Sequence, residues 1–173
     1  LFQAVLLLLQ ERIPKAMTLF SHMAQLSDVH AASDAPEAPI RVFSSPDTPT
    51  PQVQLLSNGR YHVMVTHAGG GYSRWKDLAV TRWREDGTRD NWGSFCYVRD
   101  VNSGELWSTA YQPALKQADT YETIFSEAKA EFRCRDHDLD THTEIAVSPE
   151  DDIELRRITI INRSGKRRAI DVT

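Results

Sequence analysis

The stretch NGRYHVMVTHAGGGYSRW, residues 58–75, decides the fold class of this chain. It opens with the turn dipeptide Asn-Gly, and residues 61–66 then alternate between Tyr or Val and His, Met or Thr. A period of two over six residues is typical of a strand with one buried face. Three consecutive glycines, residues 69–71, end the run. The stretch therefore predicts a β-strand followed by a sharp turn.

Further short runs of apolar and aromatic residues follow, and polar turns separate them. They cover residues 78–83, 94–99, 106–110, 120–125, 128–134, 141–147, 153–161 and 169–172. Many short strands with polar turns between them predict a mainly β fold, an antiparallel β-sandwich. The last two runs flank Asn-Arg-Ser-Gly at 162–165, which predicts that they pair as a hairpin.

Apolar residues change phase within the second-to-last run. Ile153 and Leu155 are odd-numbered, whereas Ile158 and Ile160 are even-numbered. A period of two that changes phase predicts a bulge near 156–157 or a strand that switches layers.

The composition divides the chain into three zones. Residues 1–27 have helical character and contain no glycine, which predicts a short helical segment. Residues 28–52 contain five of the eight prolines, which predicts an extended linker, ordered only where the apolar residues of 40–43 can dock. Residues 53–173 hold all four tryptophans and all eight glycines, and they form the predicted β-sandwich.

Charge and hydrophobicity exclude several classes of protein. The 173 residues have a formal net charge of -4, a hydrophobic fraction of 40% and a charged fraction of 25%, as in a soluble globular protein. A nucleic-acid binder needs a concentrated basic surface, so we expect no nucleic-acid partner. The opening LFQAVLLLLQ is apolar but shorter than the about 20 residues that cross a bilayer. Cys96 and Cys134 belong to no CxxC pair, and we expect free buried thiols.

The glycines at 69–71 raise the question of a phosphate-binding loop. Such loops need GxxxxGK[ST] or GxGxxG and a helix start, and the Tyr-Ser-Arg-Trp-Lys-Asp that follows here is a poor helix start. We therefore expect no nucleotide cofactor. Two interpretations remain. The glycines permit a backbone bend that needs positive φ or close approach, or they form a tight loop that presents Tyr72, Arg74 and Trp75 to a ligand or a neighbouring domain.

The segment CRDHDLDTHTE, residues 134–144, has the aspartate spacing of a calcium loop. Thr141 stands where that loop requires Gly, and Val147 where it requires a bidentate Glu. On a single strand, the acidic residues and the histidine would instead form a water-exposed stripe on one face: Asp136, Asp138, Asp140, His142 and Glu144. One histidine gives a metal site little support, so we expect none. The sequence has no GxSxG motif, and residues alone indicate no catalytic set.

Two segments carry a resemblance to a known family. They are LLSNGRYHVMVTHAGGGYSRWKDLAVTRWREDGTRDNWGSFCYVRDVNSGELWSTAYQP at 55–113 and EFRCRDHDLDTHTEIAVSPEDDIELRRITIINRSGKRRAIDVT at 131–173. Both closely resemble the phosphorylase-type module of bacterial cyclic β-1,2-glucan synthases, in glycoside hydrolase family 94, formerly glycosyltransferase family 36. More distantly they are similar to cellobiose and chitobiose phosphorylases. The opening LLLLQERIP resembles the end of a helical domain that precedes the module in the synthases.

The resemblance implies a fold, a parent enzyme and partners. It implies an antiparallel supersandwich, followed in the family by an (α/α)6 barrel that holds the catalytic residues. Nothing in this sequence matches those residues, so we expect the chain alone to be inactive and without a cofactor. The implied parent is a glycosyltransferase or glycoside phosphorylase at the cytoplasmic side of the bacterial inner membrane. The implied partners are a β-glucan oligosaccharide or polysaccharide, the barrel of the same parent chain, and a second copy in a homo-oligomer.

Aromatic and arginine side chains near the glycines are the candidate contacts to glucan or barrel. They are Tyr72, Arg74, Trp75, Arg89 and Trp92, beside the turn glycines Gly69, Gly70 and Gly71. An autonomous carbohydrate-binding module and a purely structural or dimerisation domain are the alternatives. Because the family sandwich runs beyond Thr173, the resemblance also implies a truncated domain. Its unpaired edge near 169–172 would favour self-association.

Overall fold

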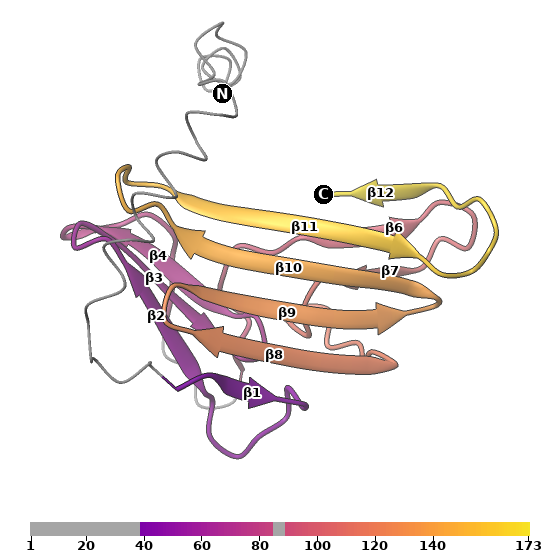
Figure 1. Cartoon of the computed structure of the whole chain (residues 1–173), viewed down its shortest axis with the longest axis horizontal. Helices are drawn as coiled ribbons and strands as arrows, with labels where there is room; N and C mark the ends of the chain where they lie inside the picture. Colours follow the sequence, from indigo (N-terminus) through magenta and orange to yellow (C-terminus); the bar gives the residue numbers. More distant parts are fainter. Residues whose placement is uncertain (1–38, 85–88) are drawn as a thin grey trace, which may run out of the picture. The chain divides into compact units, whose positions relative to one another are not determined.

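The computed structural model describes residues 39–84 and 89–173, which belong to one compact unit that starts at Ala38. Strands in three antiparallel sheets make up the regular structure of these residues (Figure 1). The predicted mainly β fold is therefore confirmed. The helical segment predicted at 1–27 lies outside the described residues.

The largest sheet has five strands in the order β1-β8-β9-β10-β11. Its strands are β1 (Arg41–Phe43), β8 (Thr120–Ser126), β9 (Lys129–Asp136), β10 (Leu139–Val147) and β11 (Glu154–Asn162). The sequence alternation sets its two faces. In β10 the odd-numbered residues from 139 to 145 are buried, whereas Asp140, His142 and Glu144 are partly exposed. One face therefore packs inward and the other carries charged side chains.

Two smaller sheets complete the sandwich. A four-stranded sheet has the order β2-β3-β4-β5 and consists of β2 (Val53–Ser57), β3 (Tyr61–Thr66), β4 (Gly71–Trp75) and β5 (Leu78–Ala79). A three-stranded sheet has the order β12-β6-β7 and consists of β6 (Tyr97–Asp100), β7 (Leu106–Ser108) and β12 (Ile170–Val172). In Figure 1 both lie behind the five-stranded sheet, one toward each end of its strands.

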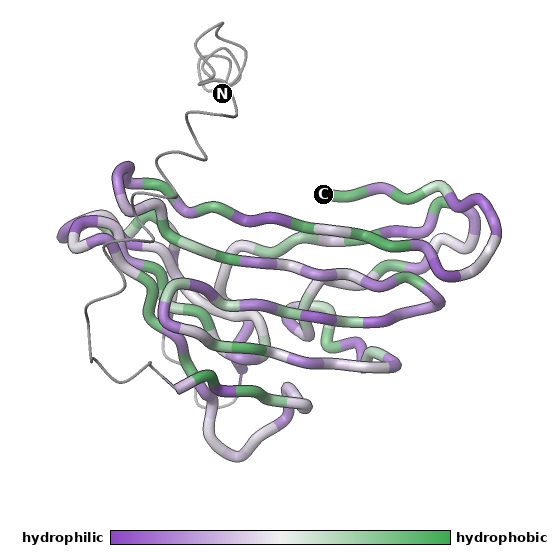
Figure 2. The backbone as a smooth tube through the Cα atoms, in the orientation of Figure 1, coloured by the Kyte–Doolittle hydropathy of each residue, from purple (hydrophilic) through white to green (hydrophobic). Residues whose placement is uncertain are grey.

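Two apolar clusters join these layers. The larger joins the four-stranded sheet to the five-stranded one through Leu56, Tyr61, Val63, Val65, Phe125, Ala130, Phe132 and Ile145. The smaller joins the three-stranded sheet to β10 through Val98, Trp107 and Leu139. Burying one large apolar side chain stabilises a fold by about 1.5–3 kcal/mol. Figure 2 shows the hydropathy pattern behind these clusters, because short hydrophobic and hydrophilic segments follow one another along the strands.

Strand β1 lies within the segment predicted as a linker. Arg41, Val42 and Phe43 pair with Phe125, Ile124 and Thr123 of β8. The Phe43 ring also contacts the Phe125 ring edge-on, with 5.5 Å between centroids. The expected docking of this stretch holds for Phe43, whereas Ile40 and Val42 are 67% and 55% exposed. The segment 28–52 contains a strand of the sandwich.

Each predicted strand run contains a strand, but the run 78–83 holds only the two residues of β5. The N–H groups of Val80 and Thr81 both donate to the Ser73 carbonyl oxygen, at 3.0 and 3.2 Å. Two residues then oppose one, so the ladder ends at Ala79.

The hairpin predicted between the last two runs is wrong. Strand β11 pairs with β10, and β12 pairs with β6 in the other layer. The chain crosses between layers after Asn162, and Arg168 fixes the crossing. Its guanidinium Nε donates to the Asp100 carboxylate at 2.9 Å. A turn-forming sequence therefore marked a crossover connection instead of a tight hairpin.

The bulge or layer switch predicted within the run 153–161 is also wrong. The register of β11 on β10 continues without interruption from Asn162 opposite Leu139 to Glu154 opposite Val147. The change of phase has a different cause, because β11 lies at a sheet edge and carries apolar side chains on both faces.

The acidic stripe predicted for a single strand does not form. The chain reverses at His137 and Asp138, whose φ angles of 49° and 62° are those of a tight hairpin turn. Asp136 consequently lies on the buried face of β9, and Asp138 lies in the turn. Only Asp140, His142 and Glu144 share the outer face of β10.

Two smaller expectations concern thiols and membranes. Cys96 and Cys134 are both free thiols, as predicted, with Cys134 buried and Cys96 half-buried. Across residues 39–84 and 89–173, no helix has the length and apolarity that a membrane crossing requires.

The three glycines form the turn that joins β3 to β4. Gly71 has φ = 154°, and a Cβ atom there would lie 2.0 Å from the Met64 carbonyl oxygen. At Gly70 a Cβ atom would lie 2.2 Å from Oδ1 of Asp90. Both positive φ and close approach therefore require glycine in this turn.

We predict that Gly71→Ala lowers the free energy of unfolding by about 2–4 kcal/mol, because it adds backbone strain and a backbone clash. Urea unfolding followed by circular dichroism measures the change.

Gly59→Ala is the matched control. Gly59 has φ = 87°, but no atom lies within 4 Å of its added Cβ, so only strain contributes, about 1–2 kcal/mol. Equal losses in the two variants would contradict the close-approach explanation.

Candidate functional site

The turn before the glycines connects the two layers through its backbone. The His67 carbonyl oxygen accepts hydrogen bonds from the Tyr121 hydroxyl at 2.6 Å and from the Thr123 hydroxyl at 2.9 Å. The Ala68 carbonyl oxygen accepts a hydrogen bond from the Gln112 N–H at 2.8 Å. These bonds hold the β3–β4 hairpin on the inner side of β8, so the turn is a structural joint.

The His67 side chain is also structural. Its ring is buried, and the Gln52 N–H donates to its Nδ1 at 3.1 Å. The proton of the neutral ring then belongs on Nε2, which lies 2.9 Å from the Thr48 hydroxyl. Burial lowers the pKa of His67, which favours this neutral form.

Asp90 fills the space beside Gly70. Its carboxylate accepts a hydrogen bond from the Thr66 hydroxyl, which in turn accepts the Gly70 N–H at 2.9 Å. Burial raises the pKa of Asp90, although the Thr66 hydrogen bond opposes that effect. This carboxylate is committed to the turn, so it is not a free general base.

Strand β4 separates the predicted contact residues onto two faces. Tyr72 and Arg74 lie opposite Met64 and His62 of β3, on the outer face of the four-stranded sheet. Trp75 lies on the other face and packs against the larger core cluster. The glycine-rich segment therefore presents Tyr72 and Arg74 from a strand, not from a loop.

A hollow of about 370 Å³ lies on this outer face. Its lining includes Leu55, His62, Tyr72, Arg74, Lys76 and Asp77. The Tyr72 ring is half-buried and contacts the Trp83 ring, with 5.6 Å between centroids. Arg74 is exposed, and its Nε donates to the Lys76 carbonyl oxygen at 3.0 Å. The hollow thus combines an aromatic surface with cationic donors.

His62 stands beside Arg74 in this hollow. The register of β3 on β4 places the two residues opposite each other, and the Ser57 hydroxyl lies 2.8 Å from His62 Nδ1. No carboxylate is hydrogen-bonded to His62 within the described residues. The Ser57–His62 contact is therefore a cross-strand polar pair that orients the imidazole, without the acidic third member of a catalytic triad.

Trp75 ties the four-stranded sheet to the loop between β10 and β11. Its Nε1 donates to Asp152 Oδ2 at 2.6 Å, and Arg60 Nε donates to Asp152 Oδ1 at 2.8 Å. The hydrogen bond from Trp75, followed by the contacts of Arg60, lowers the pKa of Asp152 despite partial burial. Trp75 accordingly serves the fold, which separates it from Tyr72 and Arg74.

Arg89 and Trp92 are the other two predicted contact residues. The Trp92 carbonyl oxygen accepts the Gly71 N–H at 2.7 Å, and the Trp92 side chain is half-buried. Arg89 is exposed. Neither Arg89 nor Trp92 lines the hollow at Tyr72.

Sequence reasoning missed His62 and Leu55 as neighbours of Tyr72 and Arg74. The signal was the predicted strand at 61–66 followed by a glycine turn. Folding that strand back as a hairpin across 67–70 places His62 opposite Arg74. Pairing with the preceding strand then brings Leu55 opposite Met64 on the same face.

Two other hollows suit a sugar less well. A small hollow beside Gln112 and Thr143 measures about 10 Å³, which is the size for one water molecule. A larger hollow of about 530 Å³ lies on the outer face of the five-stranded sheet. Its arginines are already paired, Arg133 with Glu122 and Arg135 with Asp140. Its aromatic residue is Tyr121, whose hydroxyl already donates to the His67 carbonyl oxygen, whereas the hollow at Tyr72 offers an aromatic ring beside the exposed Arg74.

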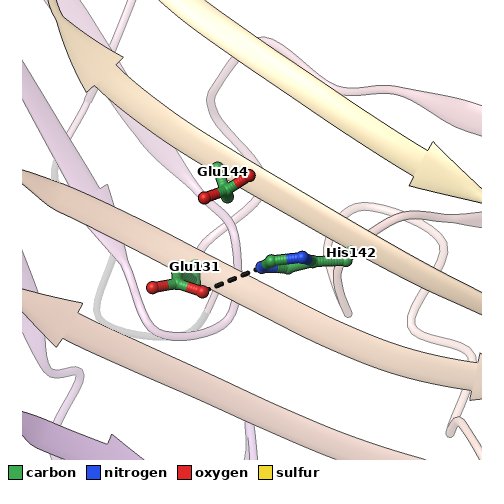
Figure 3. A group of neighbouring side chains, drawn as sticks. All are labelled: Glu131, His142 and Glu144. Carbon is green, nitrogen blue, oxygen red and sulfur yellow. Dashed lines mark hydrogen bonds and ion pairs between the residues drawn. The ribbon is translucent and has the colours of Figure 1, made fainter. Parts of the chain in front are cut away.

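Glu131, His142 and Glu144 form a cluster on the outer face of β9 and β10 with metal-ligand geometry (Figure 3). The His142 ring Nε2 lies 2.8 Å from Glu131. Lys129 Nζ lies 2.8 Å from Glu131 and 3.2 Å from Glu144.

Two arginines also balance the negative charge of the carboxylates in this cluster. Arg133 lies 3.2 Å from Glu131, and Arg157 Nε donates to Glu144 at 2.6 Å. A dication would have to displace these cations, so the cluster acts as an ion-pair network.

The thiols are unsuited to nucleophilic chemistry. Burial, followed by the nearby Asp136 carboxylate, raises the pKa of Cys134 to about 12. Burial also raises the pKa of Cys96, although Arg156 opposes it. A reactive cysteine needs a depressed pKa, because the thiolate is the nucleophile.

Comparisons with known proteins agree with this architecture. Residues 36–173 match the family model described as the glycosyl hydrolase 94 supersandwich domain. The chain is 34% identical over 172 residues to the cyclic beta-(1,2)-glucan synthase of Rhizobium meliloti, covering 99% of this chain and 6% of that protein. It is 29% identical over 134 residues to the N,N'-diacetylchitobiose phosphorylase of Vibrio proteolyticus, covering 75% of this chain and 17% of that protein. The chain therefore spans less than a fifth of either relative.

The ion-pair network predicts an acid-sensitive contribution to stability. Burial opposes ionisation of Glu131, but hydrogen bonds from Lys129 and His142 outweigh it and lower the pKa to about 2 from 4.5. A depressed folded-state pKa gives stability that is complete above pH 4.5 and is lost as the pH falls toward 2. We predict that Glu131→Gln flattens the pH dependence of the free energy of unfolding in this window.

Urea unfolding at a series of pH values measures the slope for each variant. Glu122→Gln is the control, because Glu122 also pairs with Arg133 but has a side chain 42% exposed, against 7% for Glu131. An identical loss of slope in both variants would count against a special role for Glu131.

Proposed function

This chain belongs to the glycosyl hydrolase 94 supersandwich family, and from that premise we propose that it is a non-catalytic part of a carbohydrate-active enzyme that binds β-glucan and packs on the catalytic barrel. The observation that carries the proposal is the hollow at Tyr72 and Arg74 on the outer face of β2, β3 and β4.

The chemistry of the hollow fits a glucan. The apolar face of a pyranose ring can stack on the exposed part of Tyr72. Arg74 and His62 can donate hydrogen bonds to ring hydroxyls, and Lys76 adds a further donor. Leu55, which is 68% exposed, supplies apolar surface beside these polar groups. Concave sites with a few convergent polar groups are the usual form of ligand sites.

A non-catalytic role is supported by the side chains that could do chemistry. Both thiols have raised pKa values, and the buried His67 and the half-buried Asp90 are committed to the glycine turn. Asp77, the carboxylate that lines the hollow, is fully exposed and lies 3.8 Å from Arg74. Within the described residues, the hollow therefore lacks the facing pair of carboxylates that glycoside chemistry uses.

The relatives suggest the parent enzyme. Their names describe a cyclic beta-(1,2)-glucan synthase, an N,N'-diacetylchitobiose phosphorylase and a solabiose phosphorylase. We propose that the parent is a glycosyltransferase or glycoside phosphorylase of one of these kinds, with cyclic β-1,2-glucan synthesis favoured by the 34% identity. In that setting it would act at the cytoplasmic side of the inner membrane.

An autonomous carbohydrate-binding module is the second candidate. It is favoured by the fact that one sheet supplies most of the hollow, so a ligand would need no second domain to complete its site. In a structural or dimerisation domain, the third candidate, the half-buried Tyr72 and the exposed Arg74 would contact protein.

Calorimetry with β-1,2-glucan oligosaccharides tests the proposal. We predict that the chain binds them, and that Tyr72→Ala and Arg74→Ala each weaken binding about tenfold, equivalent to about 1.4 kcal/mol.

Trp75→Phe is the matched control from the same strand. It removes the hydrogen bond to Asp152 on the opposite face, so it should lower stability by about 1–2 kcal/mol and leave glucan affinity unchanged. If the unmodified chain does not bind, the protein-contact role is favoured. Equal weakening by all three substitutions would place the glucan elsewhere.

We also predict that the chain alone releases no glucose 1-phosphate from β-1,2-glucan oligosaccharides in the presence of phosphate. Phosphate-dependent release by the purified chain would overturn the non-catalytic assignment.

A further inference from the structure

Trp83 is the most exposed of the four tryptophans, and it packs into neither of the two apolar clusters. Its exposed fraction is 38%, whereas Trp107 is 1% exposed and Trp75 and Trp92 are half-buried. The Trp83 ring instead contacts the ring of Tyr72, with 5.6 Å between centroids. Aromatic side chains commonly line ligand sites, so a pair of rings beside a hollow has the character of a binding surface.

The segment that carries Trp83 is anchored on β4. After β5 ends, the N–H groups of Val80 and Thr81 both donate to the Ser73 carbonyl oxygen. The Ser73 N–H donates in return to the Thr81 hydroxyl at 2.8 Å. Both backbone groups of Ser73 are thus committed to this segment, and Ser73 is the neighbour of Tyr72 in the strand. The anchor therefore places the Trp83 ring against the Tyr72 ring.

The two rings form one aromatic surface that begins in the hollow. Tyr72 belongs to the lining of the hollow, whereas Trp83 lies outside it. A ligand that fills the hollow and continues over Tyr72 therefore meets Trp83 next. The planes of the two rings are inclined by 54°. Because a sugar ring stacks parallel to an aromatic ring, two sugar rings stacked on this pair are inclined to each other as well.

The linkage of a glucan decides whether neighbouring sugar rings can be inclined in this way. In a β-1,4-linked glucan the two linkages leave opposite ends of each pyranose ring, so the chain extends as a flat ribbon. In a β-1,2-linked glucan they leave adjacent carbon atoms, so the chain turns at every unit. Consecutive units of the β-1,2-linked chain can therefore stack on both rings, whereas a flat ribbon stacks on one of them.

We propose that Trp83 is a second stacking surface of the site at Tyr72, and that the inclined pair selects β-1,2-linked over β-1,4-linked glucan. One sugar unit stacks on Tyr72 in the hollow, beside Arg74, and the next unit stacks on Trp83. The inference rests on the proposed glucan binding, to which it adds a specificity-determining residue. The preference is a difference between two affinities, because the flat chain loses one stacking contact.

Calorimetry with β-1,2-linked and β-1,4-linked glucan oligosaccharides of equal length tests this preference. The unmodified chain should bind the β-1,2-linked ligand about tenfold more tightly. Trp83→Leu keeps an apolar side chain but has no ring. It should weaken binding of the β-1,2-linked ligand about tenfold and leave the β-1,4-linked ligand unaffected, so the preference disappears. Trp83→Phe is the matched control, since it keeps a ring and should retain the preference.

The outcomes distinguish this inference from the proposed function. Equal weakening of both ligands by Trp83→Leu would mean that Trp83 only supports the Tyr72 ring, and it would overturn the second stacking surface. Binding that Tyr72→Ala weakens but that shows no linkage preference would also overturn it, while the glucan site would stand. If neither ligand binds the unmodified chain, both proposals are wrong. Because Trp83 lies outside both apolar clusters, its variants should fold, and urea unfolding checks this.

Discussion

The close approach of the β3–β4 turn to its neighbours is the constraint on which the rest of this sandwich depends. Gly71 passes the Met64 carbonyl oxygen where no side chain fits, and Gly70 leaves room for the Asp90 carboxylate. The carbonyl oxygen of His67 can then accept hydrogen bonds from two side chains of β8. Because these bonds are buried, each would leave an unsatisfied group if the turn moved. The turn therefore fixes where the four-stranded sheet sits on the five-stranded one.

The position of the four-stranded sheet determines which side chains of β4 face the core and which face outward. With the turn fixed, alternate residues of β4 must face opposite ways. Trp75 enters the core and reaches Asp152, which ties the β10–β11 loop to the same sheet. Tyr72 and Arg74 are left on the outer face with His62. One strand thus supplies both a structural clamp and a candidate ligand surface, and rigid supporting strands suit a site that must hold its geometry.

The sequence was sufficient to locate most strands, but it did not predict which strands pair with each other. Alternation located β3, β8, β9 and β10 within a few residues, because burial on one face leaves a period of two. It gave β12 the wrong partner, since the turn signal at 162–165 is compatible with either a hairpin or a crossover. It also grouped Tyr72, Arg74 and Trp75 as one surface, because their faces depend on where β4 begins. The Arg168–Asp100 contact that guides the crossover joins residues 68 positions apart.

The charged outer face of the five-stranded sheet explains why β11 stands out. Over β9 and β10, acids and bases neutralise each other, as around Glu131, and such a surface has little to gain from covering by another protein. On β11 the outer face also carries the exposed apolar side chains of Leu155 and Ile161. They lie beside backbone groups that point away from β10. Charge on an edge normally discourages pairing, and a bulge would twist the edge away. The uninterrupted register of β11 contains no such bulge, so on this strand the charges of Arg156 and Arg157 are what discourages edge-to-edge pairing.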